Sequence, residues 1–168
     1  MSMHKNLKLK GAKHLPPIKS ILCIDTAMKT GWAKIDREGN KTSGTKKFGE
    51  SKVSGGGMKY HKFMLWIEEQ TEDIDAVFFE EVRNHKGVDA SHSYGFYAGY
   101  LMGLCEKKRI PYQGIPVGTI KKHATGKGNA GKEMVIKSVK KKGHNPEDDN
   151  EADALALLYY VIEEFRIG

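Results

Sequence analysis

Cysteine is scarce in this chain, and so are long hydrophobic runs. The 168 residues include two cysteines, Cys23 and Cys105, which lie far apart in apolar segments. We therefore expect two reduced core residues rather than a disulfide. The seven histidines show no zinc-like spacing with each other or with the cysteines, so the sequence offers no zinc motif.

No hydrophobic run is long enough to suggest a membrane protein. The longest apolar-rich window, YGFYAGYLMGLC (94–105), is much shorter than the ~20 residues of a transmembrane helix. Residues 1–19 are basic but lack the apolar core of a signal peptide. Together with the reduced cysteines, these absences favour a cytoplasmic protein with no membrane partner.

Acidic residues are outnumbered by basic ones. The chain has 28 Lys and Arg against 21 Asp and Glu, a formal net charge of +7, and such an excess favours a polyanionic partner, usually nucleic acid. Residues 1–19 contain five lysines and no acid, which we interpret as a flexible basic arm that could contact nucleic acid. The remaining chain, 20–168, has the size of one domain with a proper core.

A second lysine-rich stretch lies between Thr119 and His144. It contains eight lysines and a single acid, Glu133. Such a stretch is often only the solvated face of a helix, but beside a set of carboxylates it would suit the tracking of a phosphate backbone. A P-loop is a poor interpretation, because Lys132 is followed by Glu133 instead of Ser or Thr.

Apolar patterning predicts alternating strands and helices. Residues 60–67 carry apolar side chains at helical spacing, whereas DAVFFEEV (75–82) has the short apolar core of a buried strand. We predict an α/β fold with a mixed central sheet of about five strands flanked by helices. The expected strands cover 20–25, 31–36, 43–48, 75–82 and 110–115, with a turn at 37–41, and the expected helices lie around 60–67, over 90–108, near 131–142 and over 149–165.

Carboxylates stand where packing alone does not require them. Asp25 ends the first apolar strand, and Glu80 and Glu81 end a later one. Asp25 could cap the turn that follows it, and acids at the start of the last helix would oppose its macrodipole. Each acid taken alone therefore has an ordinary structural explanation. Asp153 fits that explanation least, since it lies one turn inside the helix and borders the apolar run Leu155–Leu158.

These carboxylates would meet if the first and fourth strands were neighbours and the last helix packed on them. Asp149 and Asn150 lie within roughly 60° of Asp153 around the helix axis, so one of them would share its face. Oxygen ligands of this kind suit Mg²⁺ or Mn²⁺. Two such ions, roughly 3.5–4 Å apart, can activate a water and stabilise the leaving oxygen at a phosphodiester.

Three segments in the right order resemble the RuvC-type Holliday junction resolvases of the RNase H-like nuclease superfamily, and look closest to their phage-encoded branch. They are ILCIDTAMKTGWA (21–33), DAVFFEEV (75–82) and NPEDDNEADALAL (145–157). The first segment alone also resembles the phosphate loops of actin-like ATPases, but this chain lacks room for the second lobe those proteins need. The resemblance covers most of 20–165 and implies an RNase H-like fold in a bacterial or phage-infected cell.

The activity that the resemblance implies is that of a crossover junction endodeoxyribonuclease. It would depend on Mg²⁺, with Mn²⁺ able to substitute, and would cut branched DNA: four-way junctions and, more broadly, flaps and forks. The implied metal ligands are Asp25, Glu80 and Asp153, with Asp149 or Asn150 completing the site, because the family usually has Asp or His where Asn150 stands. Asn is a weaker, neutral ligand, so the alternative is a non-catalytic binder of branched nucleic acid with the same fold.

The resemblance also implies DNA contacts. Lys121 and Lys132 match family lysines that grip the backbone near the scissile phosphate, so Lys132 would also assist catalysis. Arg83 stands about where several family members have an aromatic residue that wedges into the junction. The expected DNA-binding residues are Lys121, Lys122, Lys127, Lys132 and Arg83.

Glycines recur every four residues along the helix predicted at 90–108, at Gly95, Gly99 and Gly103. Each glycine inside a helix costs about 1 kcal/mol relative to alanine, so we expect a closely packed helix face. The pattern alone slightly favours packing against the chain's own sheet over packing against a second subunit. The resemblance favours a homodimer through residues 90–108, because the family's corresponding helix contributes to a two-fold dimer.

Overall fold

The computed structural model describes residues 17–49, 55–83 and 87–167. Its centre is a five-stranded sheet in the order β3-β2-β1-β4-β5. β2 is antiparallel to β1 and β3, and β4 is parallel to β1 and β5, which confirms the predicted mixed sheet. Most of the predicted basic arm, residues 1–16, lies outside the described residues. The strands are β1 (Ile21–Asp25), β2 (Lys29–Ile35), β3 (Lys41–Lys47), β4 (Ala76–Glu81) and β5 (Tyr112–Pro116), and the helices are α1 (Met58–Gln70), α2 (Val88–Lys108), α3 (Val117–Thr125), α4 (Lys132–Lys141) and α5 (Asp149–Phe165).

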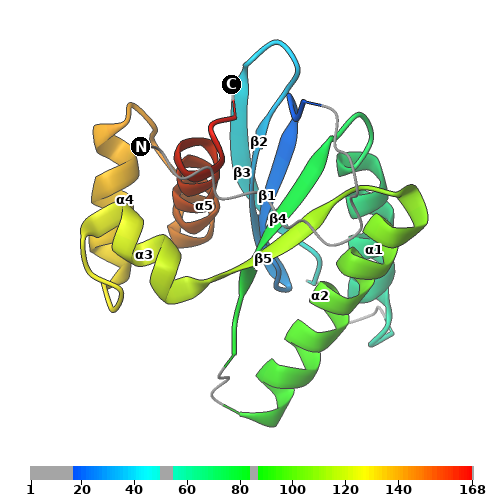
Figure 1. Cartoon of the computed structure of the whole chain (residues 1–168). Coiled ribbons are helices and arrows are strands. Elements are labelled where there is room, and N and C mark those ends of the chain that lie inside the picture. The colour runs from blue at the N-terminus through cyan, green and yellow to red at the C-terminus, as the bar shows by residue number, and fades with distance from the viewer. Residues whose placement is uncertain (1–16, 50–54, 84–86, 168) are drawn as a thin grey trace.

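Helices cover both faces of the sheet (Figure 1). α5 packs on β1 and β2 with α3 and α4 beside it, and α1 and α2 lie on the other face. Successive side chains of a strand point to opposite faces. On β1, Ile21 and Cys23 join the core under α5, whereas Leu22 and Ile24 join the core under α1 and α2. The same alternation decides which acidic side chains face α5.

α3 is the helix that the apolar patterning missed. It has one buried side chain, Ile120, so it shows no apolar repeat that could mark it in the sequence. It starts directly after β5 and ends at Thr125, and the next residue, Gly126, has a φ of 82°, in the left-handed region that favours glycine. The lysine-rich segment therefore forms two short helices, α3 and α4, that both contact α5.

The glycine stripe of α2 faces outward. The helix turns large apolar side chains such as Tyr97 and Leu101 to the core. A Cβ atom at Gly95, Gly99 or Gly103 would meet nothing within 4 Å in the part of the chain that the structure describes. The interpretation that this stripe packs against the chain's own sheet is therefore wrong. None of the helices in the described ranges is long and apolar enough to cross a membrane.

Candidate metal centre

Three carboxylates from distant parts of the sequence meet at one end of the sheet. Asp25 is the last residue of β1, Glu80 lies at the end of the neighbouring strand β4, and Asp153 lies in the second turn of α5. Each offers one oxygen, and these oxygens all lie within 4.8 Å of one another. Among the described residues, no other group of three or more Asp, Glu, His or Cys side chains approaches so closely. Oxygen donors at this spacing fit a divalent cation.

Strand alternation selects Glu80 over its neighbour Glu81. On β4, Phe78 belongs to the core under α5, and Phe79 belongs to the core under α1 and α2. Glu80 follows Phe78 by two residues and therefore faces α5. Glu81 faces the opposite way, and its carboxylate accepts a hydrogen bond from the guanidinium of Arg83 (3.2 Å).

Two other acidic residues connect the start of α5 to β2 and β3 through hydrogen bonds and an ion pair. Asp148 caps the helix by accepting a hydrogen bond from the Glu151 N–H (3.0 Å). It also accepts hydrogen bonds from the Thr45 hydroxyl (2.6 Å) and from Lys29 Nζ (2.8 Å). Burial alone would raise the pKa of Asp148, but its bonds to Lys29 and Thr45 hold that pKa well below its usual range. Glu151 is buried and accepts a hydrogen bond from the Ser43 hydroxyl (2.6 Å).

Sequence reasoning missed this anchoring role. It explained Asp148 and Glu151 by the helix dipole alone. The available signal was the Asp-x-x-Glu spacing of Asp148 and Glu151, which resembles a capping box.

β2 brings a glycine against the first turn of α5. A Cβ atom on Gly31 would lie 1.9 Å from the backbone oxygen of Asn150, so only glycine allows the strand and helix to come this close. The glycine of the motif ILCIDTAMKTGWA thus sets how deeply α5 sits on the sheet. The position of Asp153 follows from that depth.

Burial and mutual repulsion disfavour the charged forms of the three carboxylates. Burial, followed by the charges of Asp25 and Asp153, raises the pKa of Glu80 to about 8. Burial, followed by the charges of Asp153 and Asp149, raises the pKa of Asp25 to about 7. Burial is also the main reason that the pKa of Asp153 is raised to about 6. A bound divalent cation would compensate these charges, so the electrostatics of the centre fit a metal site.

Two of the predicted DNA-binding lysines stand beside the centre. Lys132 begins α4 and forms an ion pair with Asp149, to which it donates a hydrogen bond. Its charge acts against the burial that raises the pKa of Asp25. The charge of Lys121 acts in the same way on Glu80. Both lysines are therefore close enough to the centre to affect the pKa values of its carboxylates.

The other predicted DNA contacts lie on the surface. Lys122 in α3 and Lys127 in the loop before α4 are exposed. Arg83 follows β4, is exposed, and forms an ion pair with Glu81. The structure thus places Lys121 and Lys132 beside the carboxylates, whereas Lys122, Lys127 and Arg83 are exposed.

The two predicted fourth ligands are placed differently. Asp149 directs its carboxylate to Lys132 and is not one of the three carboxylates that meet. The backbone carbonyl of Asn150 lies against Gly31. Either residue lies within the first turn of α5, before Asp153, and the identity of the fourth ligand stays a prediction.

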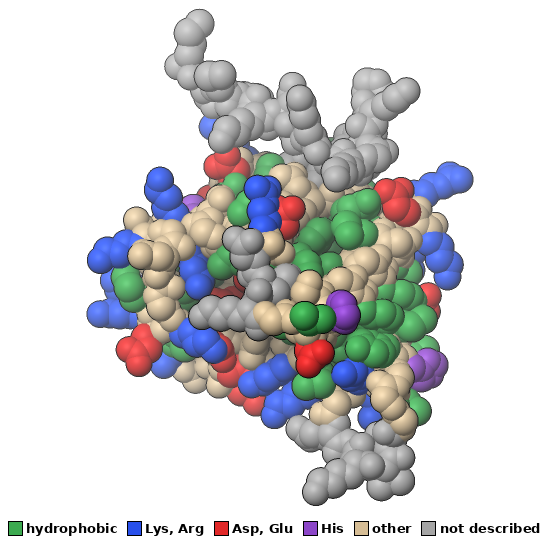
Figure 2. Space-filling view, turned by 90° about the horizontal axis from the view of Figure 1, so that it is seen from below, with side chains coloured by type: hydrophobic (Ala, Val, Ile, Leu, Met, Phe, Trp, Pro, Cys, Tyr) green, Lys and Arg blue, Asp and Glu red, His purple; other side chains and the backbone are tan. Residues whose placement is uncertain are grey.

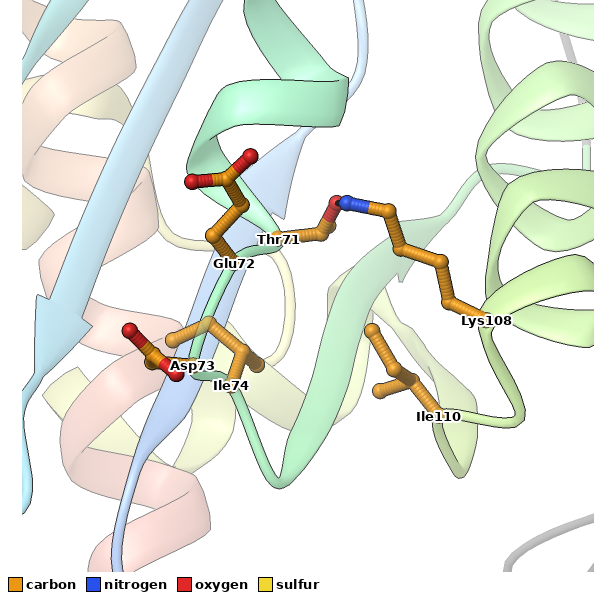
Figure 3. Close-up of a pocket in the computed structure, with 6 residues that line it drawn as sticks. All are labelled: Thr71, Glu72, Asp73, Ile74, Lys108 and Ile110. Atoms are coloured by element: carbon orange, nitrogen blue, oxygen red, sulfur yellow. Dashed lines mark hydrogen bonds between the residues drawn. The ribbon is translucent and has the colours of Figure 1, made fainter.

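A pocket of about 480 Å³ lies at the opposite end of the sheet, where β4 and β5 begin (Figure 3). Lys108 reaches across it and donates hydrogen bonds to the Thr71 hydroxyl (2.9 Å) and the Glu68 carbonyl (2.6 Å). These bonds satisfy polar groups at the end of α1, so Lys108 joins α2 to α1. The pocket lining consists of Thr71, Glu72, Asp73, Ile74, Lys108 and Ile110.

Comparison with known proteins identifies the family. Over 149 residues the chain is 30% identical to the crossover junction endodeoxyribonuclease RuvC of Rickettsia prowazekii (strain Madrid E), a match that covers 83% of this chain and 94% of the relative. The chain belongs to the RuvC family. No protein-family model matches it.

Solved structures of RuvC proteins share the fold. The T. thermophilus RuvC in complex with Holliday junction substrate matches with a TM-score of 0.70 at 18% identity, covering 88% of this chain and 97% of that chain. A second Thermus thermophilus RuvC structure matches at 0.63 and 17% identity, over 88% and 96% of the two chains. The yeast mitochondrial Holliday junction resolvase Ydc2 matches at 0.62 and 10% identity, over 92% and 82%.

These comparisons confirm the predicted RuvC resemblance and the RNase H-like fold. The curated relative is bacterial. Affinity to the phage-encoded branch of the family stays a prediction.

Proposed function

We propose that this RuvC-family chain is a crossover junction endodeoxyribonuclease that depends on Mg²⁺, with Mn²⁺ able to substitute, and cleaves four-way DNA junctions. The observation that carries the proposal is the meeting of Asp25, Glu80 and Asp153, whose oxygens lie within 4.8 Å of one another. Their raised pKa values add support, because the nearby lysines do not offset burial, and a bound cation would let all three carboxylates stay charged together.

The chain's own residues divide the work between metal binding and phosphate binding. Asp25, Glu80 and Asp153 would hold the cation, with Asp149 or Asn150 completing its ligands. When bound, the cation supplies Lewis acidity and an activated water for attack on a phosphodiester. The three carboxylates come from β1, β4 and α5, so the packing of helix on sheet keeps them in place before DNA arrives.

Positive side chains would hold the scissile phosphate next to those carboxylates. Lys132 pairs with Asp149 and could exchange that carboxylate for a phosphate oxygen when DNA binds. Lys121 lies in α3, and its charge acts against the burial that raises the pKa of Glu80. Such contacts neutralise charge and position the backbone without reading bases.

Branched DNA is the proposed substrate. The view from below shows Lys and Arg side chains gathered on the left, over the region of α3 and α4 (Figure 2). Lys121, Lys122, Lys127 and Lys132 belong to this segment, and Arg83 lies at the end of β4. The T. thermophilus relative forms a complex with Holliday junction substrate, which supports four-way junctions as substrate here, with flaps and forks as a broader range.

A homodimer through residues 90–108 completes the proposal. Two active sites must cut two strands symmetrically, and an isologous two-fold contact achieves this with a single surface patch. The exposed stripe of Gly95, Gly99 and Gly103 supports this helix as the contact, because side-chain-free positions let two backbones approach closely.

A second candidate is a non-catalytic binder of branched nucleic acid. The observation that favours it is Asn150, a neutral residue where the family usually has Asp or His. The same three carboxylates would then hold a weakly bound cation, or none, without cleavage.

One gel separates the two candidates. A labelled four-way junction is incubated with the full chain, with and without Mg²⁺, and a matched linear duplex serves as control. We expect cleavage products from the junction only when Mg²⁺ or Mn²⁺ is present. Junction binding without cleavage at any metal concentration would favour the non-catalytic binder.

A further inference from the structure

Tyr94 in α2 holds the end of β4. Its hydroxyl accepts a hydrogen bond from the Val82 N–H (3.2 Å) and donates one to the Glu80 carbonyl (3.2 Å). Tyr94 is half-buried and comes from the opposite face of the sheet to α5. One side chain thus bridges two backbone groups on either side of Glu81, at the end of the strand that carries Glu80.

The end of β4 is no longer paired with β1. The pairing of β1 with β4 ends with Ile24 opposite Phe79, one residue before Glu80. Pairing with β5 continues on the other side to Glu81. Glu80 therefore lies one residue beyond the end of the β1 pairing, where β4 is still paired with β5.

The Tyr94 hydroxyl lies at the edge of β4 that is no longer paired with β1. The Val77 N–H donates to the carbonyl of Pro111, beside β5, so the backbone groups of odd-numbered β4 residues point toward β5. The Glu80 carbonyl and the Val82 N–H point the other way, toward the side of β1, because backbone groups of a strand alternate between its two edges. The hydroxyl thus takes the place of the missing ladder partner.

We propose that Tyr94 is a positioning residue that keeps Glu80 in place to share a divalent cation with Asp25 and Asp153. This inference rests on the proposed function. The three carboxylates repel one another when charged, so a ligand at a loose strand end would move away from the other two. The two hydrogen bonds of the Tyr94 hydroxyl restrict this movement of Glu80. Because α2 is also the proposed dimer helix, the same hydroxyl links the subunit contact to the metal centre.

Tyr97 provides a matched control on the same helix. Its hydroxyl is buried and has no hydrogen-bond partner within the described residues. Tyr94→Phe and Tyr97→Phe remove the same atom from α2, but only the first removes bonds to the β4 backbone. We expect Mn²⁺ binding, measured by calorimetry on the metal-free full chain, to weaken about 10- to 100-fold in Tyr94→Phe. Tyr97→Phe should bind Mn²⁺ as the wild type does.

Cleavage and hydrogen exchange give two further readouts. Tyr94→Phe should cleave the junction slowly at limiting Mn²⁺ and approach the wild-type rate at saturating Mn²⁺, because its ligands are intact. The Val82 amide should exchange slowly in the wild type and rapidly in Tyr94→Phe. Unchanged Mn²⁺ affinity in folded Tyr94→Phe, or a fast-exchanging Val82 amide in the wild type, would overturn the inference. Absence of Mn²⁺ binding by the wild type would instead overturn the proposed function.

Discussion

Carboxylates at and beside this centre differ in pKa because their surroundings differ. Burial and neighbouring carboxylates raise the pKa of Glu80 to about 8 and that of Asp25 to about 7. The hydrogen bond and charge of Lys132 lower the pKa of Asp149. Asp149 thus has a direct lysine partner, whereas Lys132 and Lys121 only partly offset the burial that raises the pKa values of Asp25 and Glu80.

Glu80 and Glu81 provide the sharpest test of single residues. Glu80→Gln removes a ligand from the centre without changing the shape of the side chain, so cleavage should fall at least about 100-fold while junction binding persists or strengthens. Glu81→Gln changes a carboxylate that faces the other way and binds Arg83, so cleavage should stay within about threefold of the wild type. Initial rates on a labelled junction at saturating Mg²⁺ measure both. An equal loss of cleavage rate in the two variants would show that the face of β4 on which a carboxylate lies does not decide whether it binds the metal.

The contribution of Asp149 can be tested by the same assay. Asp149→Ala should reduce cleavage more than Glu81→Ala, because Asp149 lies on the helix turn next to Asp153 and pairs with Lys132. The reverse order would move the ligand role to Glu81.

The raised pKa values make stability depend on pH and metal. Glu80, Asp25 and Asp153 have folded-state pKa values of about 8, 7 and 6 against ordinary values near 4. Between about pH 4 and 8 the metal-free folded protein therefore binds more protons than the unfolded chain, so this group's contribution to stability falls as pH rises. A divalent cation binds the deprotonated form, so its stabilising effect should rise with pH.

Thermal unfolding at pH 5.5 and pH 8 tests this directly. We expect Mn²⁺ to raise the Tm by several degrees at pH 8 and by little at pH 5.5, since about 1 kcal/mol moves the Tm of a domain of this size by roughly 2–4 °C. Glu80→Gln serves as control, because it removes one of the titrating groups and should flatten the metal-free pH dependence. A larger Mn²⁺ effect at pH 5.5 than at pH 8 would contradict the assignment.

The docking of α5 on the sheet is what brings helix and strand carboxylates together. Asp148 and Glu151 tie the first turn to β3 through Thr45 and Ser43. Gly31 lets that turn approach β2. The helix start is therefore held by polar bonds at its edge, while its buried leucines pack on the core below.

Gly31→Ala should disturb this docking. Its Cβ atom would lie 1.9 Å from the Asn150 backbone oxygen, so the backbone of α5 must shift. Overpacking of this kind costs about 1–3 kcal/mol, so we expect a lower Tm and slower cleavage. Gly57→Ala is the control, because a Cβ atom there meets open space in the described structure and φ is −81°. A Gly31→Ala variant as stable as Gly57→Ala would mean that the close approach does not set the docking.

In the face of the molecule that Figure 2 shows, Lys and Arg side chains are most numerous on the side of α3 and α4, with others at the lower and right margins. Hydrophobic side chains are most visible on the side of α1 and α2. The first side suits DNA phosphates, and the second suits another protein surface. The metal centre lies between them, at the ends of β1 and β4.

The dimer is tested on the apolar side. Gly99→Leu adds a large side chain in the middle of the exposed glycine stripe, so it should give monomers or poorly soluble protein. Light scattering at micromolar concentration measures the mass. Lys137→Leu, which adds a leucine to an exposed position of α4, should leave the dimer intact. A wild-type monomer under these conditions would contradict the dimer.

The basic side is tested through salt dependence. Lys132→Ala should slow cleavage and reduce the slope of log affinity against log salt by about 1 on every DNA, since a phosphate contact carries no base information. Lys62→Ala in α1, on the other face of the sheet, should change neither. Junction affinity should exceed duplex affinity, because a dimer can offer two lysine clusters to one junction. Equal affinity at moderate salt would favour a general nuclease.

The sequence by itself determined the elements and their order. The predicted last helix, 149–165, coincides with α5, and the predicted strand at 75–82 contains β4. Apolar spacing, strand length and turn residues are local properties, so they can be read without knowing the neighbours. The short helix α3 was missed for the same reason, since it has a single buried residue and no apolar repeat.

Only the tertiary structure decided where the polar side chains point and what they contact. Glu80 differs from Glu81 by the face of a strand, which the pairing of β4 within the sheet fixes. The glycines of α2 face outward because its large side chains fill the core. Glu151 became an anchor through Ser43, 108 positions earlier in the chain. Burial and proximity arise from such distant contacts, and no local pattern encodes them.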